Sequence, residues 1–160
     1  MTADTLIVYA SHHGFTRKCA LLLKEKLGER ADLSELKGKQ PDPTSYQCIL
    51  IGSSIHAGSI QKSIKRFCFH QQPLLLKRKI GLFLSCMEEG EKAQQEFDEA
   101  YPDWLRNHAR AKAIFGGAFD FERMNAIERF IIRKISGVNE SVERFDPTKI
   151  DQFIKEITTD

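Results

Sequence analysis

Short apolar runs alternate along the chain with longer segments in which apolar residues recur every three or four positions. The runs lie at 5–10 (TLIVYA), 48–52 (CILIG), 79–85 (KIGLFLS) and 111–118 (AKAIFGGA). They are too short for free-standing helices, and we interpret them as strands buried on both faces. Residues 31–36 (ADLSEL) alternate apolar and polar, as a strand with one covered face does. The pattern therefore predicts five strands.

The segments between these strands have the periodicity of helices. Helical spacing covers 16–29, 61–72, 91–108 and 121–135. Pro102 should divide the third of these. A last helix should begin at Asp146-Pro147, with aspartate as the N-cap and proline at the first helical position. Strands that alternate with helices pair in parallel through right-handed crossovers, so we expect an open α/β sheet with helices on both faces.

The length of 160 residues favours a single domain, 1–160. A helical insertion at about 120–144 exceeds what a five-stranded, doubly wound sheet needs. The apolar runs fall far short of the roughly 20 residues that span a bilayer. The N-terminus has no basic flank followed by a long apolar segment, so a cytoplasmic location is the default expectation.

Charge and cysteine content exclude several other classes. A net charge of +2 is too small to indicate nucleic-acid binding. The four cysteines stand singly and without CxxC spacing, which predicts neither a disulfide framework nor a metal site. These cysteines are Cys19, Cys48, Cys68 and Cys86.

The segment SHHGFT, 11–16, joins the first strand to the first helix and is the first candidate for binding chemistry. It has no Gly-Lys-Ser/Thr and only one glycine, so it is neither a Walker A loop nor a dinucleotide fingerprint. Unpaired backbone N–H groups at a helix start favour an anion, and the hydroxyls of Ser11 and Thr16 could donate to it. The alternative is that one of these hydroxyls caps the helix and that the two histidines face solvent.

Two further loops follow the third and fourth strands. The small and polar stretch GSSIHAGS, 52–59, could bring its backbone close to the polar edge of a flat ring, or could be a flexible connector. Cys86 and Met87, which follow Ser85, have soft side chains suited to an aromatic ligand, although a methionine at a strand end also fills cores. Nothing in the sequence marks Cys86 as an activated thiol.

With these loops in place, the chain resembles the flavodoxin-like proteins. Their phosphate loop, Ser/Thr-x-x-Gly-x-Thr, is matched by Ser11, Gly14 and Thr16. The resemblance implies a three-layer sandwich, a five-stranded parallel sheet of order 2-1-3-4-5, and FMN as the cofactor. More specifically, segments 51–67 and 127–137 are similar to menaquinone-dependent protoporphyrinogen IX dehydrogenases, as is the strand end 115–119. Segment 127–137 resembles the insertion that distinguishes those enzymes.

The resemblance also implies which residues bind FMN. The FMN phosphate would be held by the first loop, Ser11, His12, His13, Gly14, Phe15 and Thr16. One side of the isoalloxazine ring would be bordered by Ser53, Ser54, Ile55, His56, Ala57 and Gly58. The other side would be bordered by Ser85, Cys86 and Met87. The loop departs from electron-carrier flavodoxins at two of these positions, His13 and Phe15, where a hydroxyl and an amide side chain are usual. His56 is the candidate for assisting proton movement.

The charge of the chain bears on its partners. Electron-carrier flavodoxins are strongly acidic, whereas this chain carries +2 and local clusters of Lys and Arg. Arg129 and Arg133 could contact the carboxylates of a porphyrinogen-like or other small-molecule reductant, or an anionic membrane surface at the inner face of the cell membrane where a quinone acceptor resides. Alternatively, their helix packs against the sheet or against a second subunit of a homo-oligomer. The resemblance implies an FMN-dependent oxidoreductase of the quinone-dependent protoporphyrinogen IX dehydrogenase type, which acts in heme biosynthesis. The competing functions are a non-catalytic electron carrier and a flavin-free binding module.

Overall fold

The computed structural model describes residues 2–55, 58–119, 125–136 and 142–160. The elements, in chain order, are β1 (Thr5–Tyr9), α1 (Phe15–Leu27), the 3-10 helix η1 (Gly28–Arg30), β2 (Ala31–Glu35), β3 (Cys48–Ser54), α2 (Lys62–His70), α3 (Gln72–Leu75), β4 (Lys79–Ser85), α4 (Gly90–Ala100), α5 (Asp103–His108), β5 (Ala111–Ile114), β6 (Gly116–Phe119), α6 (Ala126–Ser136), β7 (Val142–Phe145) and α7 (Pro147–Thr158). None of the described helices is long and apolar enough to cross a bilayer.

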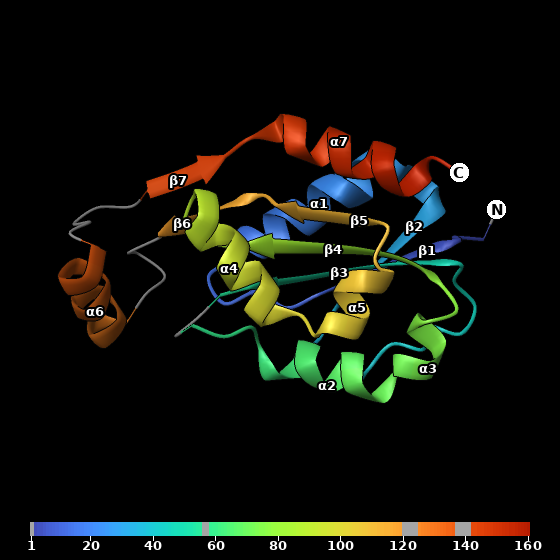
Figure 1. Cartoon of the computed structure of the whole chain (residues 1–160), viewed down its shortest axis with the longest axis horizontal. Helices are drawn as coiled ribbons and strands as arrows, with labels where there is room; N and C mark the ends of the chain where they lie inside the picture. The colour runs from blue at the N-terminus through green and yellow to red at the C-terminus, as the bar shows by residue number, and fades with distance from the viewer. Residues whose placement is uncertain (1, 56–57, 120–124, 137–141) are drawn as a thin grey trace.

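Five parallel strands form the central sheet in the order β2-β1-β3-β4-β5, as predicted. Helices α1 and α7 cover one face, and α2 to α5 cover the other (Figure 1). The two faces bury separate apolar clusters, one around Leu23 and Phe153 and the other around Phe67 and Phe97. The predicted flavodoxin-like α/β fold is therefore confirmed.

Close packing across the sheet requires glycine at one strand position. Gly52 on β3 is paired in register with Phe83 on β4. A Cβ atom at Gly52 would lie 2.0 Å from the Phe83 ring. The Phe83 ring lies directly over the β3 backbone at Gly52, in the space that a side chain at this position would need.

Local sequence signals set two of the helix boundaries. The predicted helix 91–108 is divided at Pro102 into α4 and α5. The side chain of Asp146 caps α7, since its carboxylate accepts a hydrogen bond of 3.0 Å from the Thr148 N–H. Both outcomes confirm the sequence prediction.

The predicted strand 111–118 was wrong as a single element. Its first half is β5, whereas its second half, β6, pairs antiparallel with β7, a strand that the periodicity did not predict. Phe115 between them is fully buried, with its ring centroid 5.4 Å from those of Phe83 and Phe153. Gly116 follows with φ of 97°, a left-handed conformation that turns the chain out of the central sheet. The predicted helix 121–135 is represented by α6, while 120–124 lie outside the described residues.

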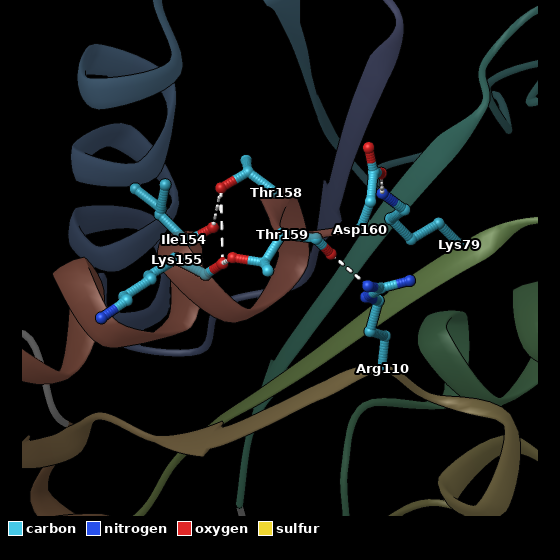
Figure 2. Close-up of polar contacts among 7 residues, drawn as sticks. All are labelled: Lys79, Arg110, Ile154, Lys155, Thr158, Thr159 and Asp160. Carbon is cyan, nitrogen blue, oxygen red and sulfur yellow. Dashed lines mark hydrogen bonds and ion pairs between the residues drawn. The ribbon is translucent and has the colours of Figure 1, made fainter.

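The edge of the sheet where β4 and β5 begin is closed by the end of α7 (Figure 2). Thr158 and Thr159 hydroxyls donate to the Ile154 and Lys155 carbonyls at 2.7 and 2.6 Å. Arg110, just before β5, donates to the Thr159 carbonyl. Lys79 at the start of β4 lies 3.6 Å from the Asp160 carboxylate. These contacts tie the C-terminal residues to the sheet, at the edge opposite to the predicted binding loops.

Candidate functional site

The three loops expected to bind a ligand meet at the carboxyl edge of the sheet. The strands that precede them, β1, β3 and β4, are neighbours, and main-chain hydrogen bonds join their ends. The Ala10 N–H donates to the Gly52 carbonyl at 3.1 Å, and the Ile55 N–H donates to the Ser85 carbonyl at 3.1 Å. The structure therefore brings together the described residues of all three predicted loops.

The first loop ends in an open helix N-terminus. The Gly14 N–H donates to Ser11 Oγ at 3.0 Å, and Gly14 itself has φ of 96°. Within the described residues, no side chain caps α1 and its first turn contains no acidic residue. The helix-capping role considered for Ser11 or Thr16 is therefore not seen. The partial positive charge of the first turn is available to an anion.

Two histidines flank this N-terminus. The rings of His12 and His13 are in T-shaped contact, with centroids 4.1 Å apart. His12 is exposed and His13 is half-buried. Imidazole N–H groups are hydrogen-bond donors, so the pair suits an anion held at the start of α1.

The side chains of Thr16 and Phe15 are buried, which for Thr16 differs from the expectation that its hydroxyl donates to the phosphate. Thr16 is fully buried, and its hydroxyl donates to Ser85 Oγ at 3.1 Å. A hydroxyl has one proton, and this bond uses it. The Phe15 ring packs against Phe145, with centroids 5.9 Å apart. Only the backbone amides of these two residues remain suited to an anion.

The second loop is closed at its base by Gln61, a residue that sequence reasoning missed. Its Oε1 accepts hydrogen bonds from the Ser53 hydroxyl and from the Ser54 N–H, the latter at 3.2 Å. Its Nε2 donates to Ser54 Oγ at 2.5 Å. The signal that could have identified Gln61 is its place immediately before α2, where a polar side chain can reach back to the preceding loop. The predicted site residues His56 and Ala57 lie outside the described residues.

Two described residues near the tip of this loop complete it. Gly58 is exposed and has φ of 75°. Ile55 is half-buried and packs against the core on the α2 side of the sheet. The loop therefore leaves β3 from a fixed base and turns at a glycine.

The third loop presents one accessible side chain. Ser85 and Cys86 are buried, and Met87 is half-buried. Burial raises the pKa of the Cys86 thiol to about 12, and the nearby Glu96 carboxylate acts in the same direction. The thiol is therefore protonated at neutral pH, so Cys86 is not an activated nucleophile. Met87 is the one of the three suited to contact a ligand.

The ribbon β6–β7 lies against the third loop and against α1. The Cys86 N–H donates to the Gly116 carbonyl at 2.8 Å, and Arg144 donates to the Met87 carbonyl at 3.2 Å. On the other side, Lys18 of α1 forms an ion pair with Glu143. The ribbon is therefore held on one side by the third loop and on the other by α1, the helix that follows the first loop.

A cavity of about 510 Å³ lies between the ribbon, the third loop and the start of α7. Met87, Ala93 and Phe115 contribute apolar surface, and Arg144 and Lys149 contribute positive charge. Arg144 is balanced by Glu89, whose carboxylate lies 3.5 Å away. The cavity therefore adjoins the predicted ring-binding loop at Met87 and offers both apolar and cationic contacts.

The predicted substrate or membrane contacts, Arg129 and Arg133, are on α6. This helix stands beyond the carboxyl edge of the sheet (Figure 1). Arg133 is exposed, and Arg129 is half-buried. The structure thus places both residues at the same end of the molecule as the loops.

Comparison with known proteins agrees with this architecture. Residues 6–145 match the family described as flavodoxin domain. A flavodoxin from Streptococcus pneumonia superimposes with a TM-score of 0.58 and 14% identity over 96% of each chain. Oxidised flavodoxin 1 from Bacillus cereus gives a TM-score of 0.51 and 16% identity, covering 74% of this chain and 88% of its own.

A WrbA-like flavodoxin from Agrobacterium tumefaciens gives a TM-score of 0.52 and 17% identity, covering 67% of this chain and 71% of its own. No curated protein matches the sequence. At these identities the structural likeness shows the fold, whereas the family match covers most of the chain. The chain belongs to the flavodoxin domain family.

Proposed function

We propose that this protein is an FMN-dependent oxidoreductase that oxidises protoporphyrinogen IX, or a closely related porphyrinogen, with a quinone as acceptor. The observation that carries the flavin assignment is the uncapped N-terminus of α1, which lies beside two loops able to border a ring. Membership in the flavodoxin domain family supports FMN as the cofactor. The resemblance of segments 51–67 and 127–137 to protoporphyrinogen dehydrogenases supports the particular reaction.

The described residues fit FMN in their donor chemistry. The phosphate would be held by the first-turn amides of α1, with Ser11, His12 and His13 around it. The ring would be bordered by the loop that Gln61 fixes and by Met87. When bound, FMN supplies two-electron oxidation, and the protein supplies orientation and electrostatics.

The protein's own residues hold the loops in place, and the described ones leave no reactive thiolate beside the ring. Gln61 holds the backbone and hydroxyl of Ser54, which fixes where the second loop leaves β3. Arg144 holds the main chain of Met87 from the other side. Cys86, protonated and buried, does not compete as a thiolate. His56, outside the described residues, stays our proposed group for proton movement at the ring edge.

The test is turnover with the reconstituted protein. Purified protein is saturated with FMN, mixed with protoporphyrinogen IX and a menaquinone analogue under anaerobic conditions, and followed by porphyrin fluorescence. The proposal predicts porphyrin formation that requires both FMN and the quinone. Retention of FMN without turnover, with reduction in two well-separated one-electron steps, would instead identify an electron carrier. Failure to retain FMN would identify a flavin-free binding module.

The position of α6 bears on the two roles considered for Arg129 and Arg133. Because the helix stands beyond the carboxyl edge of the sheet at one end of the molecule, we favour contact with an anionic surface over contact with the carboxylates of a bound substrate (Figure 1). Membrane contact would also bring the carboxyl edge of the sheet close to a lipid-dissolved quinone.

A further inference from the structure

We propose that α6 docks this protein on the surface of an anionic phospholipid bilayer, with Ile127 and Phe130 inserted among the lipids and Arg133 and Lys134 at the lipid phosphates. The proposal deepens the proposed function by assigning a partner to the insertion. It can be tested by lipid binding alone, without FMN or turnover.

The apolar part of the docking surface is a pair of exposed side chains. Ile127 is 72% exposed and Phe130 is 59% exposed. They lie three residues apart and therefore share one face of the helix. The other large exposed hydrophobic residues in the described part of the chain stand apart from one another, Leu21 on α1, Phe69 on α2 and Leu76 just after α3. Solvent exposure of adjacent large apolar side chains is unfavourable unless a partner covers them.

The charged part of the surface follows directly on the same helix. Arg133 and Lys134 are both exposed and lie in the last turn. The Lys134 ammonium lies 5.1 Å from the centre of the Phe130 ring, so cation and apolar anchor are neighbours. Residues 126–136 contain three basic residues and one acidic residue. This combination is typical of helices that lie in the interface of anionic membranes.

The arrangement of the insertion makes this helix accessible to a flat surface. In Figure 1, α6 stands clear of the sheet at the far left end of the molecule, below and to the left of β6 and β7. Lys18 and Arg144 tie that ribbon to α1 and to the third loop. A bilayer that contacts α6 would therefore face the carboxyl edge of the sheet.

The charges favour a lipid surface over a second copy of the chain. A dimer built on this face would bring together two surfaces of the same net positive charge, because residues 126–136 contain three basic residues and one acidic residue. Like charges at short distance oppose such a contact. Lipid phosphates have the complementary sign and can also accept hydrogen bonds from arginine.

Vesicle co-sedimentation tests the proposal. The full-length protein is mixed with phosphatidylcholine vesicles that contain or lack phosphatidylglycerol, at low and high salt. We expect binding only to the anionic vesicles, and weaker binding at high salt. Replacing Ile127 and Phe130 by serine should lower the affinity by about tenfold or more. Phe69→Ser, at a 76% exposed site on α2, is the matched control and should bind as the wild type does.

The charged residues are tested in the same assay. Arg133→Gln with Lys134→Gln should lower the affinity by about tenfold, whereas Lys39→Gln with Lys62→Gln, two exposed lysines elsewhere, should have little effect. Phe130→Trp should shift tryptophan emission to the blue on adding anionic vesicles. Absence of binding to anionic vesicles, equal binding by the α6 variants, or a dimer in solution that the Ile127 and Phe130 changes dissociate would overturn the proposal.

Failure of this proposal can be distinguished from failure of the proposed function. Thermal unfolding of each variant checks that the fold is retained, and FMN binding is measured without vesicles. Loss of lipid binding with porphyrinogen turnover intact would leave the enzymatic proposal standing. Lipid binding without any turnover would leave the docking surface standing.

Discussion

The Thr16 hydroxyl donates a hydrogen bond of 3.1 Å to Ser85 Oγ, across 69 residues of sequence. Both side chains are buried, with exposures of 0% and 4%. The bond joins the start of α1 to the end of β4. It therefore links the predicted phosphate loop to the predicted ring loop through the protein interior.

Thr16→Val should lower the free energy of unfolding by about 1–3 kcal/mol, because it leaves the buried Ser85 hydroxyl without its donor. Its effect on FMN affinity should be smaller than its effect on stability. Urea unfolding and FMN titration measure the two quantities, and Thr16→Ser, which keeps the hydroxyl, is the control. In a double-mutant cycle with Ser85→Ala, the two effects should couple. A large loss of FMN affinity with unchanged stability would show that the hydroxyl faces the phosphate after all.

Gln61→Ala should weaken FMN binding by about 1–2 kcal/mol, since it removes the side-chain hydrogen bonds that hold Ser53 and Ser54 at the base of the second loop. FMN fluorescence quenching on titration gives the affinity. Gln71→Ala, at the far end of α2, serves as the control and should bind FMN normally. If the two variants bind FMN equally well, Gln61 has no part in forming the site.

Gly116→Ala should destabilise the ribbon. Its φ of 97° costs about 1–3 kcal/mol for any residue with a side chain, and the new Cβ would lie 1.9 Å from the Arg144 carbonyl oxygen. Gly38→Ala shares the positive φ, at 76°, but its Cβ would have no atom within 4 Å. Chemical unfolding should therefore show a larger loss for Gly116→Ala. Equal losses of unfolding free energy in the two variants would mean that β6 and β7 can move apart to accept the new methyl group without destabilising the protein.

Alkaline pH should destabilise the protein through its buried thiols. Burial raises the pKa of Cys19 and Cys68 to about 12 each, from an ordinary value of 9.0. The folded state therefore holds these protons more tightly than the unfolded state does. The resulting stabilisation is fully present below pH 9 and is lost as the pH rises from about 9 towards 12, by about 1.4 kcal/mol per pH unit for each thiol.

Urea unfolding at several pH values above 9 measures how steeply the free energy of unfolding falls with pH. Cys19→Ala should reduce this slope by the contribution of one thiol, about 1.4 kcal/mol per pH unit. The same burial predicts slow alkylation of these thiols by iodoacetamide at pH 8 in the native state and fast alkylation in urea. A variant with an unchanged slope would mean that Cys19 titrates alike in both states.

Most of the architecture could be predicted because its signals are local. An apolar run such as 79–85 is too short for a helix, and its β4 counterpart has the predicted bounds, Lys79–Ser85. Pro102 divides a helix by removing an N–H donor, and Asp146 caps one by accepting from the chain two residues on. The alternation of such elements predicts a parallel sheet by general rules of chain connection.

The candidate site could be predicted only as a set of loops. Its location follows from the position of each segment after a strand, which places the loops at one edge of a parallel sheet. Gln61 escaped prediction because its role depends on where the preceding loop folds back. The orientation of Thr16 escaped prediction because a hydroxyl at the start of a helix can serve an anion, a cap or the core.

The sequence by itself determined most of the elements, the parallel arrangement of the central sheet and the edge at which a ligand would bind, because these depend on residues close together in the chain. Only the tertiary structure decided that Thr16 bonds to Ser85 and that residues 116–119 leave the sheet to pair with 142–145. Such pairings depend on groups far apart in sequence. Hydrophobic periodicity reports which face of an element is buried, but it carries no information about which distant group will satisfy a given hydrogen bond.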